Sequence, residues 1–174
     1  GIFLGGNAGT VDIKRSEIFD NDRDGILAQE PYTSSLKLNL STSLIYDNGT
    51  ANNKSGVAFN VQKGQGFNII PNTFYDNANT NLLVWLHDGN SLLKNNIFHV
   101  SSSKMYFLIN DPSSDIQAND IANNYFREYT GDATVDIYMV PDFYETATGF
   151  NVHSKAIGNL GNTDPLLNAD FTLQ

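Results

Sequence analysis

The phrase Ile18-Phe19-Asp20-Asn21 decides the fold of this chain, because it returns at similar intervals. It recurs as Ile45-Tyr46-Asp47-Asn48 and Phe74-Tyr75-Asp76-Asn77, and in degraded form as Ile97-Phe98-His99 and Tyr125-Phe126-Arg127. The distance from one copy to the next varies, so the repeat is not of constant length. Self-similarity with a period in the range of roughly 20–50 residues indicates a stacked architecture, in which each repeat packs against its neighbours.

Two further apolar phrases recur within each repeat. One alternates apolar positions after a small or polar residue, at residues 1–4, 25–27, 56–59, 81–84, 104–107 and 134–137. The other is shorter and covers residues 11–13, 38–40, 67–69, 92–93 and 116–118. Short alternating runs bounded by Gly, Asn, Asp and Ser predict strands, and no stretch shows the stripe of an amphipathic helix. We therefore expect an all-β parallel β-helix solenoid of about six coils, with three short strands per coil.

Polar residues precede the first phrase in aligned columns. One expected column holds Ser16, Ser43, Asn72, Asn95 and Asn123, and the next holds Thr73, Asn96 and Asn124. Amides stacked one per coil can hydrogen-bond along the column as a ladder. We assign these asparagines to structure rather than to a ligand.

Composition limits the classes of function. The chain has 174 residues with 19 acidic and 10 basic side chains, so its formal charge of −9 argues against nucleic acid as a partner. It contains no cysteine, which excludes disulfides and thiol chemistry. No apolar stretch is long enough for membrane insertion, and residues 1–6 lack the pattern of a signal peptide. A secretion signal, if there is one, would precede this sequence.

The coil pattern and its asparagines resemble the right-handed β-helix repeats of the pectate-lyase-like superfamily. The resemblance covers about residues 1–140. Residues 141–174 are similar to the irregular closing segment of many bacterial β-helix proteins, and we expect them to pack on the solenoid. Because the first residues show no polar cap, we expect the chain to be the carboxy-terminal portion of a longer protein. The superfamily includes polysaccharide lyases, glycoside hydrolases, epimerases and phage tailspikes.

Alternation in the first strand of each coil predicts which side chains face outward. With Val57, Leu82, Met105 and Val135 inward, three outward columns are expected. They hold Ala58, Leu83, Tyr106 and Asp136, then Asn60, Trp85, Leu108 and Tyr138, then Gln62, His87 and Asn110. Aromatic rings beside polar groups suit sugars, so the candidate substrate-binding residues are Asn60, Trp85, His87, Tyr106, Asp136 and Tyr138. The alternative is that a loop, another part of the protein or a partner subunit covers them.

Two carboxylates are candidate catalytic groups. Asp88 and Asp111 are separated by the same interval as Phe74 and Ile97, so they are expected in one column just past the first strand. A glycosidase needs paired carboxyl groups, about 5–5.5 Å apart for retention or about 6.5–9.5 Å for inversion. The alternative is turn chemistry, because Asp88-Gly89 and Asp111-Pro112 are ordinary turn dipeptides.

Asp20, Asp22 and Asp24 match the opening of a calcium loop. The position of the closing Glu is Pro31, so the motif is incomplete, and the equivalent residues of later coils form repeat turns. Calcium is therefore the weaker hypothesis, and the three scattered histidines suggest no metal triad.

The resemblance implies a secreted, extracellular or cell-surface protein that processes or binds polysaccharide. Lyases of the superfamily use a Lys or Arg base, and only Lys104 lies near the outward columns of the first strand, so we favour a glycoside hydrolase over a lyase. The alternative is a non-catalytic adhesin, tailspike or surface-structure module that binds a glycan or a partner chain. Fold analogy does not separate an enzyme from a binding module.

Overall fold

The computed structural model describes residues 1–5, 8–29, 35–51, 54–60, 66–85, 91–99, 105–110, 120–127, 137–139, 142–144 and 156–161. Side chains are described for most of these residues, but not for β13, β16 and β17, nor for Ala8, Ser35, Trp85, Arg127, Ala156 and Gly161. The described ranges contain strands and no helix, so they hold no helix that could cross a bilayer.

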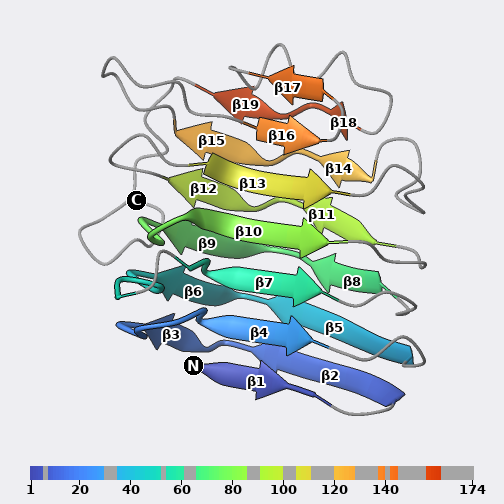
Figure 1. Ribbon diagram of the computed structural model, residues 1–174. Coiled ribbons are helices and arrows are strands. Elements are labelled where there is room, and N and C mark those ends of the chain that lie inside the picture. The colour runs from blue at the N-terminus through green and yellow to red at the C-terminus, as the bar shows by residue number, and fades with distance from the viewer. Residues whose placement is uncertain are drawn as a thin grey trace.

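The strands form three sheets, which we name A, B and C (Figure 1). Sheet A contains β1 (Ile2–Leu4), β4 (Ile26–Gln29), β7 (Val57–Asn60), β10 (Thr80–Trp85), β13 (Met105–Asn110), β16 (Ile137–Met139) and β17 (Asp142–Tyr144). Sheet B contains β2 (Ala8–Lys14), β5 (Ser35–Ser41), β8 (Gly66–Ile69), β11 (Leu92–Lys94), β14 (Ile121–Ala122) and β18 (Ala156–Ile157). Sheet C contains β3 (Glu17–Phe19), β6 (Ser43–Tyr46), β9 (Asn72–Tyr75), β12 (Ile97–His99), β15 (Tyr125–Arg127) and β19 (Leu160–Gly161).

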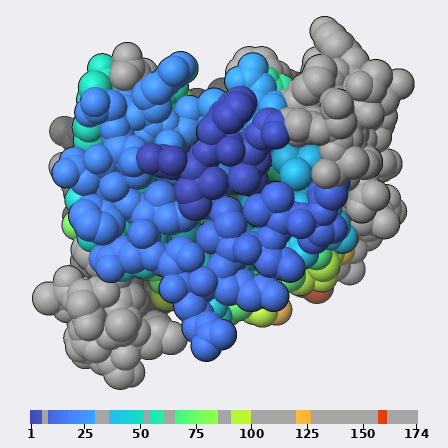
Figure 2. Space-filling view, turned by 90° about the horizontal axis from the view of Figure 1, so that it is seen from below, coloured from blue at the N-terminus to red at the C-terminus, as the bar shows by residue number. Residues whose placement is uncertain are grey.

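Successive strands enter sheets A, B and C in turn, and each pairs in parallel with its equivalent in the next coil. This confirms the predicted all-β parallel β-helix with three strands per coil. The strand number differs slightly from six uniform coils, because β17 adds a seventh strand to sheet A and pairs antiparallel with β16. Figure 2 views the solenoid end-on, with the first coil in blue forming the end face.

Alternate residues of the strands fill the interior. In sheet A the fully buried side chains are Ile26, Ala28, Val57, Phe59, Leu82 and Val84. The prediction that Val57 and Leu82 face inward is therefore confirmed, and Phe59 and Val84 are buried as the same alternation requires. Phe107 pairs with Leu82, but its side chain lies outside the described part.

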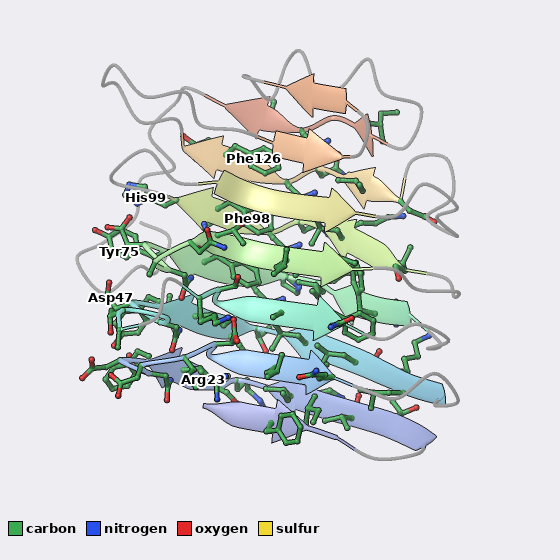
Figure 3. All side chains as sticks on the ribbon, in the orientation of Figure 1. Arg23, Asp47, Tyr75, Phe98, His99 and Phe126 are labelled. Atoms are coloured by element: carbon green, nitrogen blue, oxygen red, sulfur yellow. The ribbon has the colours of Figure 1, made fainter. Side chains whose placement is uncertain are left out.

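Sheet C keeps the register that the repeated phrase predicts from β3 to β9 and from β12 to β15, but it is shifted by one residue between β9 and β12. Phe98 pairs with Phe74 and Phe126, whereas the phrase aligned Ile97 with Phe74. The three phenylalanine rings are fully buried and stack with centroid distances of 4.9 and 5.3 Å (Figure 3). A slip of one residue would exchange the inner and outer sides of the strand, so burial of the larger ring favours the observed register.

The polar ladder follows this register. Its members are Ser16, Ser43, Asn72, Asn96, Asn124 and Asn159. The Asn72 side-chain amide donates to the Asn96 Oδ1 at 3.2 Å, and the Asn96 amide donates to the Asn124 Oδ1 at 3.0 Å. The ladder is confirmed, but the placement of Asn95 and Asn123 in it is wrong. Both are exposed corner residues with positive φ angles of 59° and 55°, a conformation that asparagine tolerates.

The sheet B strand of the fifth coil was also misplaced. β14 at Ile121–Ala122 pairs with β11, with Ile121 opposite Leu93. The predicted strand at residues 116–118 lies outside the described residues. Ile121 is fully buried, so the interior position goes to a residue further along the chain than the short apolar pattern indicated.

Candidate functional site

The outer surface of sheet A combines two columns of outward positions, and we call it the sheet A outer face. The apolar column holds Phe3, Leu27, Ala58, Leu83, Leu108 and Tyr138. The amide column holds Gln29, Asn60, Trp85 and Asn110. The parallel strands of sheet A stack along the solenoid axis (Figure 1), and their register carries both columns across successive coils.

Strand alternation turns these columns outward. Leu27 lies between the fully buried Ile26 and Ala28, and Leu83 lies between the fully buried Leu82 and Val84. Leu27 and Leu83 are half-buried, while Phe3 is 68% exposed at the first strand. Phe3, Leu27 and Leu83 are thus at least partly exposed on the outside of the sheet, whereas Ala58, which lies between Leu27 and Leu83 in the column, is buried.

The described amides of this face have no hydrogen-bond partner within the described part of the chain. Gln29 is exposed and Asn60 is half-buried, and neither side chain donates or accepts a hydrogen bond there. Within the described part of the chain, both amides therefore retain two donors and an acceptor for a ligand.

Sheet B shows the opposite arrangement on its outer side. The Asn39 amide donates to the Asp12 Oδ1 at 2.8 Å, and the Asn68 amide donates to the Asn39 Oδ1 at 2.9 Å. These polar groups satisfy one another from coil to coil. The contrast indicates that the outer amides of sheet A, rather than those of sheet B, are available for recognition.

The predicted binding residues fall into different places. Asn60 and Trp85 are paired neighbours, as predicted. Leu82 pairs with Phe107 rather than with Met105, so Asn110 follows Trp85 in the amide column. The prediction that Leu108 and Tyr138 continue this column is therefore wrong, because both belong to the apolar column.

Tyr106 is also separated from Trp85. It precedes Phe107 on β13, four residues before the Asn110 that pairs with Trp85, or roughly 13 Å along the strand. The two residues therefore do not occupy neighbouring positions on the paired strands. His87 and Asp136 lie outside the described residues.

The candidate catalytic residues Asp88 and Asp111 also lie outside the described residues. Their prediction as one column used the interval that separates Asp88 from Asp111. The same interval would place Trp85 opposite Leu108, but β10 and β13 pair Trp85 with Asn110. Catalysis by Asp88 and Asp111 stays a prediction.

The candidate calcium residues do not gather around one point. Asp20 has a φ of 52°, like Asp47 at 49° and Asp76 at 45°, so it occupies a repeated corner turn. The Asp24 Oδ1 accepts a hydrogen bond from the Ser55 backbone N–H at 2.8 Å. Asp22 and Asp24 line a shallow depression beside Phe3, Leu27 and Gln29. Among the described residues no group of three His, Cys, Asp or Glu side chains could hold a metal ion, and calcium binding by Asp20, Asp22 and Asp24 stays a prediction.

An outer aromatic column on sheet C was missed by the sequence analysis. It holds Phe19, Tyr46, Tyr75 and His99, the residues that follow the inward apolar residue of each coil. Tyr75 and His99 lie at the same edge of the molecule (Figure 3). The signal was present in the repeated phrase, where an aromatic residue precedes aspartate in three coils.

The rings of this column contact one another. Phe19 and Tyr46 are stacked with centroids 5.0 Å apart and an interplanar angle of 7°, and Tyr75 meets His99 edge to face at 4.6 Å. Stacking covers ring faces that a sugar would otherwise contact. Partial desolvation, the hydrogen bond that Tyr46 donates to Glu17 at 2.9 Å, and the nearby carboxylates raise the pKa of Tyr46. This column is therefore less suited to sugar stacking than the sheet A outer face.

Comparison with known proteins identifies one family. The family model described as "Right handed beta helix region" matches residues 1–161. No curated protein and no solved structure matches the chain.

Proposed function

Because the chain belongs to the right-handed β-helix family, we propose that it handles polysaccharide and binds an extended glycan along the sheet A outer face. The observation that supports this most directly is that amides lie beside apolar residues on this face. The amides of Gln29 and Asn60 have no partner in the described part of the chain, and the neighbouring apolar column contains Leu27 and Leu83. A sugar ring has apolar C–H faces and hydroxyl edges. The two adjacent columns match both kinds of surface.

The geometry of the solenoid suits a linear ligand. Neighbouring strands lie about 4.8 Å apart, so equivalent side chains recur at that interval along the axis. An extended chain of pyranose units advances by a similar distance per unit. Successive sugars can therefore meet equivalent positions of successive coils, and we expect affinity to rise with oligosaccharide length.

We propose that Trp85 contributes an aromatic surface to this site. It follows the buried Val84 and pairs with Asn60 and Asn110, and alternation predicts an outward side chain. His87, Tyr106 and Asp136 stay in the proposal as residues beside the sheet A outer face, although the register separates Tyr106 from Trp85. Tyr138 stays in it as a member of the apolar column.

Glycoside hydrolysis is the proposed reaction if the protein is an enzyme, with Asp88 and Asp111 as the paired carboxylates. The alternative is a secreted or surface module that binds glycan without cleaving it. Release of new reducing ends from a bound oligosaccharide, lost in both Asp88→Asn and Asp111→Asn, supports the hydrolase. Binding without cleavage supports the module.

Binding is tested by titrating oligosaccharides of increasing length while following the fluorescence of Trp85, the only tryptophan. Asn60→Ala should weaken binding about 2–10-fold, the equivalent of one net hydrogen bond. Thr73→Ala, at a half-buried outward position of sheet C, is the control and should leave affinity unchanged. If calorimetry gives equal affinities for wild type, Asn60→Ala and Trp85→Ala, the glycan does not bind this face.

A further inference from the structure

The parallel strands of sheet A are free of charge, whereas the antiparallel strand β17 carries Asp142. The six parallel strands β1, β4, β7, β10, β13 and β16 contain no Asp, Glu, Lys, Arg or His. Sheet B carries Asp12, Lys14, Lys37 and Lys94 in its strands, and sheet C carries Glu17 and Arg127. The chain has a formal charge of −9, yet the parallel strands of the sheet that forms the proposed site carry no charged residue.

We infer that the glycan bound by the sheet A outer face is a neutral polysaccharide rather than a polyuronate, an inference that rests on the proposed function. A hydroxyl both donates and accepts hydrogen bonds, and so does the amide of Gln29 or Asn60. A carboxylate only accepts, and its desolvation needs charge-assisted hydrogen bonds or a cation. The strands of the face supply amide groups and apolar surface, but no cation.

The charges beside the face add to this selectivity. At the first coil, Asp22 and Asp24 line the depression next to Phe3 and Leu27, together with Arg23. The net negative charge of the whole chain also opposes the approach of a polyanion. A neutral glycan is repelled neither by these carboxylates nor by the net charge of the chain. Its affinity should therefore depend little on ionic strength.

The test compares hexasaccharides of equal length on the full chain. Cellohexaose, xylohexaose, mannohexaose and hexagalacturonate are titrated by calorimetry at low and at high salt. We expect at least one neutral hexamer to bind about tenfold or more tightly than hexagalacturonate at low salt, a difference of about 1.4 kcal/mol. Its affinity should change by less than about twofold with salt, because it carries no charge to screen.

The possible failures are distinguishable. Hexagalacturonate binding as tightly as the best neutral hexamer overturns the inference and leaves the proposed glycan binding intact. Failure of all four hexamers to bind overturns both.

A charge placed on the face provides a second measurement. Asn60→Lys should strengthen hexagalacturonate binding about 5–10-fold, as expected for a new charge-assisted contact. The matched control Thr73→Lys adds the same charge on sheet C and should have no such effect. Equal gains in the two variants, with native circular dichroism in both, would overturn the location of the ligand on sheet A.

Discussion

Replacing Phe98 by alanine tests the register of sheet C. The Phe98 side chain is fully buried between Phe74 and Phe126, with ring centroids at 4.9 and 5.3 Å and nearly parallel planes. Phe→Ala in a core destabilises by about 3–5 kcal/mol, through lost transfer free energy and the remaining cavity. Two ring stackings are lost together, so we expect a value toward the upper end of this range.

The matched variant is Ile97→Ala, one residue earlier on the same strand. Ile97 is half-buried on the outer side of sheet C, so its truncation should cost less than about 1.5 kcal/mol. Urea unfolding followed by circular dichroism and by tryptophan fluorescence measures both free energies. A larger loss for Ile97→Ala than for Phe98→Ala would refute the observed register and restore the alignment that the repeated phrase suggested.

Three further predictions concern the ladder, the outer tyrosine and calcium. Asn96→Ala should lower the free energy of unfolding by about 2–4 kcal/mol, because the Ile69 carbonyl loses the Asn96 donor and the Asn72 amide keeps only the Leu40 carbonyl of its two acceptors. Asn95→Gly at the exposed positive-φ corner should change it by less than about 1 kcal/mol in the same urea experiment. Tyr46 has a pKa raised above 10.0, so the native state holds its proton more tightly than the unfolded chain, and stability should fall as pH rises above this value. Glu17→Gln should bring the phenolate absorbance transition of Tyr46 to lower pH, and an unchanged transition would contradict the role of this carboxylate. Added calcium or chelator should leave the melting temperature unchanged. If calcium raises the melting temperature of the wild type but not that of Asp22→Asn, the Asp20–Asp24 segment binds calcium.

The candidate site was predicted in part. The pairing of Asn60 with Trp85 followed from the spacing of two similar strands, Val57–Asn60 and Thr80–Trp85. The position of Tyr138 did not, because the interval from Leu82 to its partner Phe107 is two residues longer than the interval from Leu82 to Met105 that the phrases suggested. An even shift of this kind keeps each side chain on its face but changes its neighbours along the axis.

The sequence by itself determined the class of fold and the inner and outer sides of most strands. A repeated phrase with apolar residues at alternate positions can bury them all only by stacking coil on coil, and this is visible in residues alone. Where two adjacent residues are both apolar, as at Ile97 and Phe98, the tertiary structure decided which of them faces the interior. There, alternation is compatible with either side, and the ring of the neighbouring coil determines which residue is buried.

The tertiary structure also decided which amides are structural and which are available to a ligand. Asn39 and Asn60 are the same residue type at outward positions of short strands. Asn39 has Asp12 and Asn68 as its neighbours in adjacent coils and is held by both, while Asn60 is flanked by Gln29 and Trp85 and has no hydrogen bond within the described residues. Hydrogen bonding of a side chain along a solenoid depends on the coils above and below it, and those neighbours are set by the register rather than by the local sequence.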